Sequence, residues 1–303
     1  MRAAICLALL LFSSCDNATR PPEKAQEPTK VETELLGVTA NYKFAKEAHL
    51  SAWEDDYLRD HEDLIVSYLG NEIWRIRGSS WSELRDWNGP IADPAIGKDI
   101  TGDGIPEAIF LNEEEGSHGP VIYYVFHLDQ PLRVTILNGG DLGLYFKDLD
   151  GDGIYEVEGH DMAFMSWHAA PANSARPSVI LRHQQGAYVL ALDLMRKAPP
   201  DLNQLLGNAT LLHADKMWQL AAPYDIPEKL IEVLTDLVYS GNAALARTFL
   251  DWAWLPNKAG KEAFAAEFFE CRLRKSEYWP ALAAMNGLSP DKPIGECPGT
   301  EEG

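Results

Sequence analysis

The order of hydrophobic and polar residues divides this chain into five zones. Residues 1–14 contain an unbroken apolar run at positions 3–12, which is too short to span a bilayer and is typical of a signal peptide. Residues 15–39 are polar, charged and proline-containing, which predicts a disordered tether. In residues 40–70, large apolar side chains recur at helix-like spacing, which predicts an N-terminal helical segment ending at Gly70.

The fourth zone, residues 71–198, changes to strand-like patterns. Residues 72–76 alternate, residues 121–126 and 132–137 are rich in aromatic and β-branched side chains, and residues 178–181 and 188–190 flank a Gln-Gly turn. Short strands at this spacing predict a mostly antiparallel sheet.

The fifth zone, residues 199–303, begins at a Pro-Pro pair and has helical periodicity. One helix is expected after Asp225, with a single apolar face that contains Leu230, Leu234 and Val238. Two further helices are expected near residues 243–254 and 258–275, before a Pro/Gly-rich tail. The predicted class is therefore α+β, with a β-rich domain followed by a helical domain.

The charge balance restricts the partners. The chain of 303 residues carries 46 acidic against 26 basic residues, a formal net charge of −20. Nucleic-acid binding requires a basic surface, so that class is excluded. A large acidic excess is compatible with cation binding, although it is more often a means of remaining soluble.

The end of the apolar run resembles a bacterial lipobox. It reads Leu-Phe-Ser-Ser-Cys, and Cys15 would be the lipidated residue, carrying diacyl and palmitate chains after signal cleavage. The resemblance implies a lipoprotein held at the periplasmic face of the inner or outer membrane. Phe12 departs from the usual leucine, and an ordinary secretory signal is the alternative.

The remaining cysteines fit an oxidising compartment. Cys6 would be removed with the signal peptide, which leaves Cys271 and Cys297 as the two thiols of the folded part. A disulfide between them would fix the C-terminal tail and contribute about 3 kcal/mol in the loop-entropy description. Two free thiols are the alternative.

A nine-residue acidic pattern occurs twice, as Asp99–Glu107 and again as Asp148–Glu156. Both copies read Asp-x-(Thr/Asp)-Gly-Asp-Gly-Ile-x-Glu. Side chains at positions 1, 3 and 5 of such a tight loop converge, the glycine at position 6 permits the turn, and hard oxygens in this number suit Ca²⁺. Unmetallated turns are the alternative, since Asp and Gly are common turn formers.

This pattern resembles the FG-GAP/VCBS repeat, a calcium-loop hairpin of integrin-type β-propeller blades. Two copies are too few to close a propeller. A wider group of uncharacterised bacterial lipoproteins also places such hairpins before a helical end. The resemblance implies one or two Ca²⁺ ions, with these ligands in order: Asp99, Thr101, Asp103, Ile105 (carbonyl), Glu107, and then Asp148, Asp150, Asp152, Ile154 (carbonyl), Glu156. Thr101 replaces a carboxylate, which predicts a weaker first site.

Catalytic motifs are absent from the sequence: there is no G-x-S-x-G, H-E-x-x-H, P-loop or C-x-x-C pattern. We therefore expect a non-enzymatic calcium-binding lipoprotein of the cell envelope, with structural Ca²⁺ and a binding or scaffolding role toward an envelope protein or glycan. The alternative is an envelope hydrolase with a site near His160, Asp161 and His168.

Overall fold

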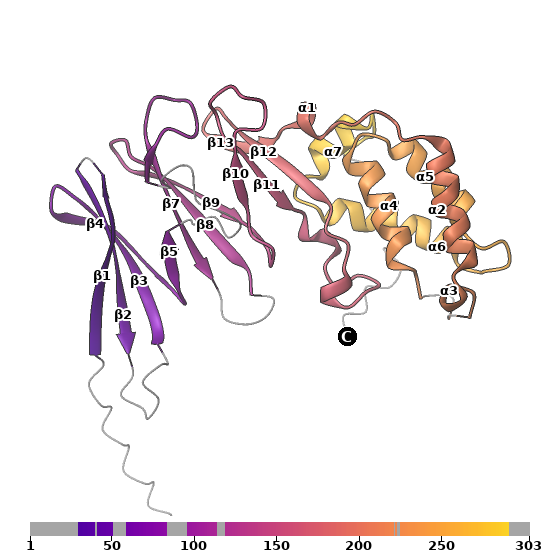
Figure 1. Ribbon diagram of the computed structural model, residues 1–303, viewed down its shortest axis with the longest axis horizontal. Coiled ribbons are helices and arrows are strands. Elements are labelled where there is room, and N and C mark those ends of the chain that lie inside the picture. Colours follow the sequence, from indigo (N-terminus) through magenta and orange to yellow (C-terminus); the bar gives the residue numbers. More distant parts are fainter. Residues whose placement is uncertain are drawn as a thin grey trace, which may run out of the picture.

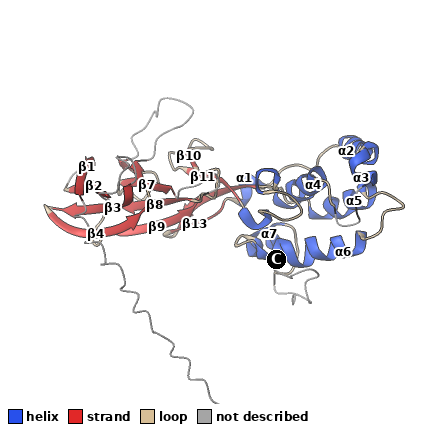
Figure 2. Cartoon of the chain, turned by 90° about the horizontal axis from the view of Figure 1, so that it is seen from below, coloured by secondary structure: helices blue, strands red, loops and turns tan. Residues whose placement is uncertain are grey.

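The computed structural model describes residues 30–39, 41–50, 59–83, 96–113, 119–220, 222 and 225–290. The molecule is elongated, with the strands at one end and the helices at the other (Figures 1 and 2). Three antiparallel sheets follow one another along the chain before the helices, which confirms the α+β class. Within these ranges, none of the sheets closes into a barrel or a propeller. The described helices include none with the length and hydropathy needed to cross a membrane.

The first sheet replaces the helix expected over residues 40–70. It is a meander of β1 (Lys30–Thr39), β2 (Tyr42–Leu50), β3 (Arg59–Tyr68) and β4 (Asn71–Gly78). The expectation of a helix was wrong, and so was that of a disordered tether over residues 30–39. Residues 1–29, with the predicted signal peptide and Cys15, lie outside the described residues.

The side chains of this sheet alternate between a buried face and a more exposed face, as a two-residue strand period requires. Phe44 in β2 and Leu64 and Val66 in β3 are fully buried on one face, while the opposite face carries mostly polar residues together with Ala45 and Ile65. Gly70 does not end a helix. It forms the β3–β4 turn with Leu69, and both residues have positive φ (82° and 49°), as tight hairpin turns require.

The second and third sheets lie in the predicted β-rich zone. The second contains β5 (Trp81–Glu83), β6 (Ile96–Lys98), β7 (Glu107–Glu113), β8 (Val121–His127) and β9 (Arg133–Asn138). The third is a meander of β10 (Tyr145–Lys147), β11 (Glu156–His160), β12 (Ser178–Gln184) and β13 (Ala187–Leu190). Two short 3₁₀ turns, Met162–Phe164 and Pro171–Asn173, interrupt the β11–β12 connection.

The helical part begins after α1 (Leu192–Met195) and the Pro-Pro pair. It comprises α2 (Leu202–Ala214), α3 (Lys216–Leu220), α4 (Glu228–Tyr239), α5 (Ala243–Ala253), α6 (Lys261–Ala266) and α7 (Trp279–Met285). The predicted apolar face of α4 is buried. The third predicted helix starts at Lys261 and passes from α-helix into a π-helical stretch (Glu267–Arg272) and a 3₁₀ turn (Leu273–Lys275).

Two hydrophobic cores support this arrangement. The larger core is continuous from the second sheet through the third sheet to the helices. The smaller core lies between the first sheet and one face of β7 and β8. Alternate residues of β7 belong to different cores, with Phe110 in the smaller and Ile109 in the larger. The β7–β8 pair is therefore buried on both faces.

Candidate metal centre

The two acidic loops occupy equivalent places in consecutive sheets. The first acidic loop, residues 99–107, connects β6 to β7, and the second acidic loop, residues 148–156, connects β10 to β11. Both strand pairs are antiparallel, so each loop is the connection of a hairpin. Strands therefore flank both loops, which lie within the predicted β-rich zone.

Backbone hydrogen bonds give the first loop its shape. The two carboxylate oxygens of Asp99 accept the N–H groups of Gly102 and Gly104 at 2.7 and 2.9 Å. Oδ1 of Asp103 accepts the N–H of Ile105 at 2.9 Å. Oε2 of Glu107 accepts the N–H of Ile100 at 2.8 Å. Positions 1, 5 and 9 are thus fixed by the backbone of their own loop.

The second loop repeats this pattern. Asp148 accepts the N–H groups of Gly151 and Gly153 at 2.6 and 3.0 Å. Oδ1 of Asp152 accepts the N–H of Ile154 at 2.8 Å, and Oε2 of Glu156 accepts the N–H of the second residue of the loop at 3.0 Å. All four bonds of the first loop therefore have a counterpart in the second.

Glycines at positions 4 and 6 of both loops make this path possible. Gly102 and Gly104 have φ of 74° and 82°, and Gly151 and Gly153 have φ of 81° and 88°. Side-chain-bearing residues rarely adopt this left-handed conformation, which glycine adopts at little cost. The sequence pattern required a glycine at position 6, and the structure adds the same requirement at position 4.

The loop-closing glutamates differ in their second partner. Glu107 and Glu156 are buried, with 1% and 0% of their surface exposed. Oε1 of Glu107 accepts the Thr101 hydroxyl at 3.0 Å and lies 3.0 Å from Nδ1 of His127. Oε1 of Glu156 instead accepts Nε of Arg182 at 2.7 Å. The glutamate of the first loop therefore contacts a hydroxyl and a histidine nitrogen, whereas the glutamate of the second loop contacts a guanidinium.

Arg182 joins several carboxylates of the second loop and its surroundings. Its Nη2 donates to Oδ2 of Asp150 at 2.6 Å, and its Nη1 lies 3.1 Å from Asp193. The hydrogen bond to Glu156 raises the pKa of Arg182 further above its ordinary value, so the guanidinium stays charged. The chain therefore supplies a cation of its own to the loop with the most carboxylates.

The counterpart environment in the first loop is a histidine pair. The rings of His127 and His183 lie 5.5 Å apart, and Nε2 of His127 lies 3.0 Å from the Thr135 hydroxyl. Burial lowers the pKa of His183, and the charge of a protonated His127 would act in the same direction. Arg133 makes only a long contact of 3.4 Å with Asp103.

The two loops touch each other. The N–H of Tyr155 donates to the carbonyl of Ile100 at 2.8 Å, and Nζ of Lys98 lies 4.2 Å from the centroid of the Tyr155 ring. A Cβ atom on Gly102 would lie 2.6 Å from Cγ1 of Ile154. The second and third sheets are therefore joined at their acidic loops.

Only some of the predicted carboxylate ligands of each loop are gathered around one point. Ligand atoms of Asp148, Asp150 and Glu156 lie within 4.8 Å of one another, as do those of Asp103, Glu107 and His127. The other two predicted aspartates, Asp99 and Asp152, are outside these two groups and bind loop N–H groups. The Thr101 hydroxyl binds Glu107.

The residues of the hydrolase alternative have separate partners. Asp161 is buried and accepts hydrogen bonds from the hydroxyls of Tyr239, at 2.5 Å, and Ser276. Nε2 of His168 lies 3.2 Å from Glu267. Burial lowers the pKa of His160, with the Arg176 charge acting in the same direction. Asp161 and His168 thus hold the β-rich part against the helices.

Cys271 is buried and disulfide-bonded. Its predicted partner, Cys297, lies outside the described residues, so the pairing itself stays a prediction.

Sequence reasoning missed Arg182, His127 and the contact between the loops. Both residues lie opposite a loop-closing glutamate: Glu107 pairs with His127 in the β7–β8 ladder, and Val157 pairs with Leu181 in β11–β12, which places Arg182 beside Glu156. The connections between these strands differ in length, so the residues do not align when the two acidic patterns are superposed. Only the strand register identifies them.

Comparisons with protein-family models, with curated proteins and with solved structures found no match to this chain.

Proposed function

We propose that this chain is a calcium-binding lipoprotein of the cell envelope, with structural Ca²⁺ and a non-catalytic binding or scaffolding role. The observation that carries the proposal is the shared set of four hydrogen bonds in the two acidic loops. The same arrangement at two places, in two sheets, indicates one loop design used twice.

The loop chemistry favours Ca²⁺ over softer ions. The backbone N–H groups fix the aspartates at positions 1 and 5 without using all of their lone pairs, which leaves carboxylate oxygens available to a hard cation. The grouping of Asp148, Asp150 and Glu156 within 4.8 Å supplies three such oxygens in the second loop. Mg²⁺ demands a near-ideal octahedron and usually keeps several waters, whereas Ca²⁺ accepts irregular sets of carboxylate oxygens.

The position of the loops supports a structural role for the ion. Because Tyr155 of the second loop binds the carbonyl of Ile100 in the first, an ion in either loop would stiffen the junction between two sheets. An ion that binds only the folded chain stabilises it by about 2.7 kcal/mol at a concentration one hundred times its Kd. Calcium would thus maintain the body that presents a binding surface to an envelope protein or glycan.

Calorimetric titration of EDTA-treated protein tests the calcium claim. We expect one or two Ca²⁺ ions per chain and a higher melting temperature in Ca²⁺ than in EDTA. Asp148→Asn and Asp99→Asn should each remove one binding event, if both loops bind. The matched control is Glu158→Gln in β11, just beyond the second loop, which should bind as the original chain does. Unchanged binding and melting in both loop variants would contradict the proposal.

The lipid anchor is tested separately. We expect the chain expressed in a bacterial host to fractionate with membranes, and Cys15→Ser to release it into the soluble envelope fraction. Recovery of the original chain in the soluble fraction, with an unmodified Cys15 by mass spectrometry, would refute lipidation and leave the calcium claim standing.

A further inference from the structure

A second cluster of metal-binding residue types lies on the first sheet, away from the acidic loops. In the β2–β3 ladder His49 is directly opposite His61, and Glu47 is directly opposite Asp63. Residues two apart in a strand share a face, so these four side chains form a square on one face of the sheet. The other face of the same strands carries Phe44 and packs into the smaller core.

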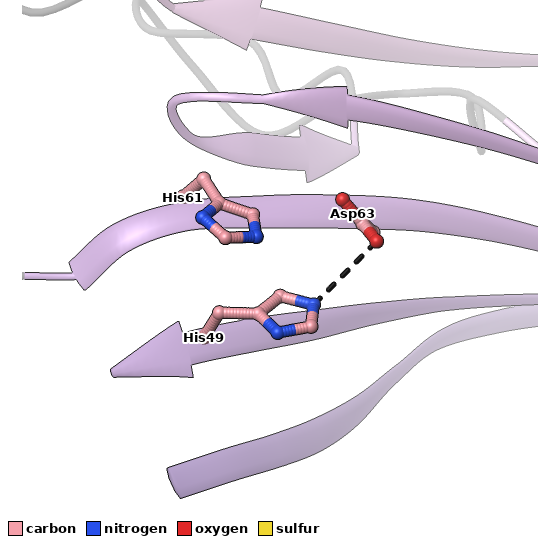
Figure 3. A group of neighbouring side chains, drawn as sticks. All are labelled: His49, His61 and Asp63. Carbon is pink, nitrogen blue, oxygen red and sulfur yellow. Dashed lines mark ion pairs between the residues drawn. The ribbon is translucent and has the colours of Figure 1, made fainter. Parts of the chain in front are cut away.

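The two imidazole rings stack across the strands, and the acid lies beside them (Figure 3). The ring centroids of His49 and His61 are 4.3 Å apart, with an interplanar angle of 15°. Ligand atoms of His49, His61 and Asp63 lie within 4.8 Å of one another. The strand register alone brings two nitrogens and one oxygen together.

The distances around Nε2 of His49 suit a small tetrahedral ion. The lone pair of an imidazole nitrogen lies in the ring plane, so the stacked His61 ring must turn to point at the same ion. Nε2 of His49 is 3.5 Å from Oδ2 of Asp63 and 3.4 Å from Oε1 of Glu47. Two ligands of a tetrahedral Zn²⁺, bound at about 2.1 Å, are separated by about 3.4 Å. Nε2 of His49 is nevertheless buried without a hydrogen-bond partner. A ring nitrogen that faces two carboxylates without such a bond is in a position for a shared cation.

Arginines hold the carboxylates in place. Nη1 of Arg75 binds Oε1 of Glu47 at 3.0 Å and Oδ2 of Asp63 at 3.1 Å, while the rest of its guanidinium is clamped by Glu72. Burial opposes ionisation of Asp63, but hydrogen bonds from Arg75 and Arg77 outweigh it and lower the pKa of Asp63. Outer partners of this kind orient metal-binding carboxylates in many sites.

We propose that His49, His61 and Asp63 form a binding site for a divalent first-row transition-metal ion of the Zn²⁺ class, with Glu47 beside the fourth position. Two imidazoles and a carboxylate match that class, whereas Ca²⁺ and Mg²⁺ take oxygen ligands. The site is independent of the acidic loops, because it uses other residues in another sheet. Together with the proposed Ca²⁺ sites, the chain would bind two kinds of metal ion, one in the acidic loops and the other on the first sheet.

Titration of the full, tag-free and EDTA-stripped chain with Zn²⁺ in excess Ca²⁺ tests this site. We expect one Zn²⁺ per chain by calorimetry, and His49→Ala, His61→Ala and Asp63→Asn should each weaken binding at least tenfold. Ca²⁺ should not displace the ion. Co²⁺ should give the intense visible absorption of a tetrahedral site in the original chain and not in the variants.

Two controls keep the test decisive. His213→Ala, in α2, should bind Zn²⁺ as the original chain does. So should Asp103→Asn, which removes a residue of the other histidine-containing group. Circular dichroism in EDTA checks that each variant is folded, and His49→Gln replaces any variant that is not. Folded His49 and His61 variants with the original affinity, or no Zn²⁺ binding by the original chain, would overturn the proposal.

Discussion

Removal of the guanidinium beside the second acidic loop should destabilise the fold, and Ca²⁺ should restore much of the loss. In Arg182→Gln, Glu156 keeps its bond to the Leu149 N–H but loses its only described cationic partner, while remaining 0% exposed. Removing one partner of a buried ion pair typically costs about 3–5 kcal/mol. The retained N–H bond places our expectation near the lower end, at about 3 kcal/mol.

The assay is urea unfolding in EDTA and in Ca²⁺, followed by circular dichroism. In EDTA we expect the variant to lose about 3 kcal/mol, because the buried carboxylate is uncompensated. Saturating Ca²⁺ should stabilise the variant more than the original chain, since the ion then replaces the missing charge beside Asp150 and Glu156. Asp193→Asn is the control: Asp193 is an exposed partner of the same guanidinium, so its loss should cost at most about 1 kcal/mol.

Two results would refute this reasoning. If Arg182→Gln in EDTA is as stable as the original chain, the Arg182–Glu156 pair does not compensate the buried charge. If the variant is destabilised but Ca²⁺ stabilises both chains equally, the ion and the guanidinium do not act on the same carboxylates. The second result would leave calcium binding intact and remove only the competition between the two cations.

Three other predictions concern packing, the junction with the helices, and pH. Gly102→Ala should lower the melting temperature more than Gly151→Ala. Both glycines have positive φ, but only the methyl group added at position 102 would collide with Ile154. An equal drop in melting temperature for the two variants would argue against close contact of the loops. Asp161→Asn should lower the free energy of unfolding by about 2–3 kcal/mol, because the buried carboxylate that accepts the Tyr239 and Ser276 hydroxyls is removed. Amide hydrogen exchange should then rise where the β-rich part meets the helices. Unchanged exchange there would contradict this role of Asp161. Burial lowers the pKa of His160 in the folded chain, so on acidification the unfolded chain takes up this proton at a higher pH than the folded chain does. Stability should therefore fall as the pH drops below about 6.5, the ordinary histidine pKa. His160→Gln should make this fall smaller, as measured by the melting temperature from pH 8 to pH 5.

The sequence was sufficient where one local rule dominated. The acidic loops follow from glycine and aspartate spacing, and the structure places strands on both sides of each, within the predicted β-rich zone. The apolar face of α4 likewise follows from its period, and its residues are buried. Both features depend only on residues that are close together in the sequence, so local patterns are enough to predict them.

The first sheet was not predictable by the same reasoning, because adjacent apolar residues supported two periods at once. Leu64 and Ile65 fit a helix face, yet in β3 only the first is fully buried, while the second lies on the opposite side. Once this segment is taken as helical, His49 and His61 are far apart. The metal-binding group of the first sheet becomes visible only through strand register, as Arg182 does in the third sheet.

The pair β7–β8, with apolar side chains on both faces, has a consequence for how the chain can be divided. Tyr124 and Phe126 face the first sheet, whereas Tyr123 and Val125 face the larger core. A fragment that begins after β4 would therefore leave an aromatic surface on β7 and β8 open to water, and that surface would favour self-association. The first sheet therefore has to be present to bury one face of the sheet that carries the first acidic loop. The smallest fragment expected to fold on its own includes both sheets.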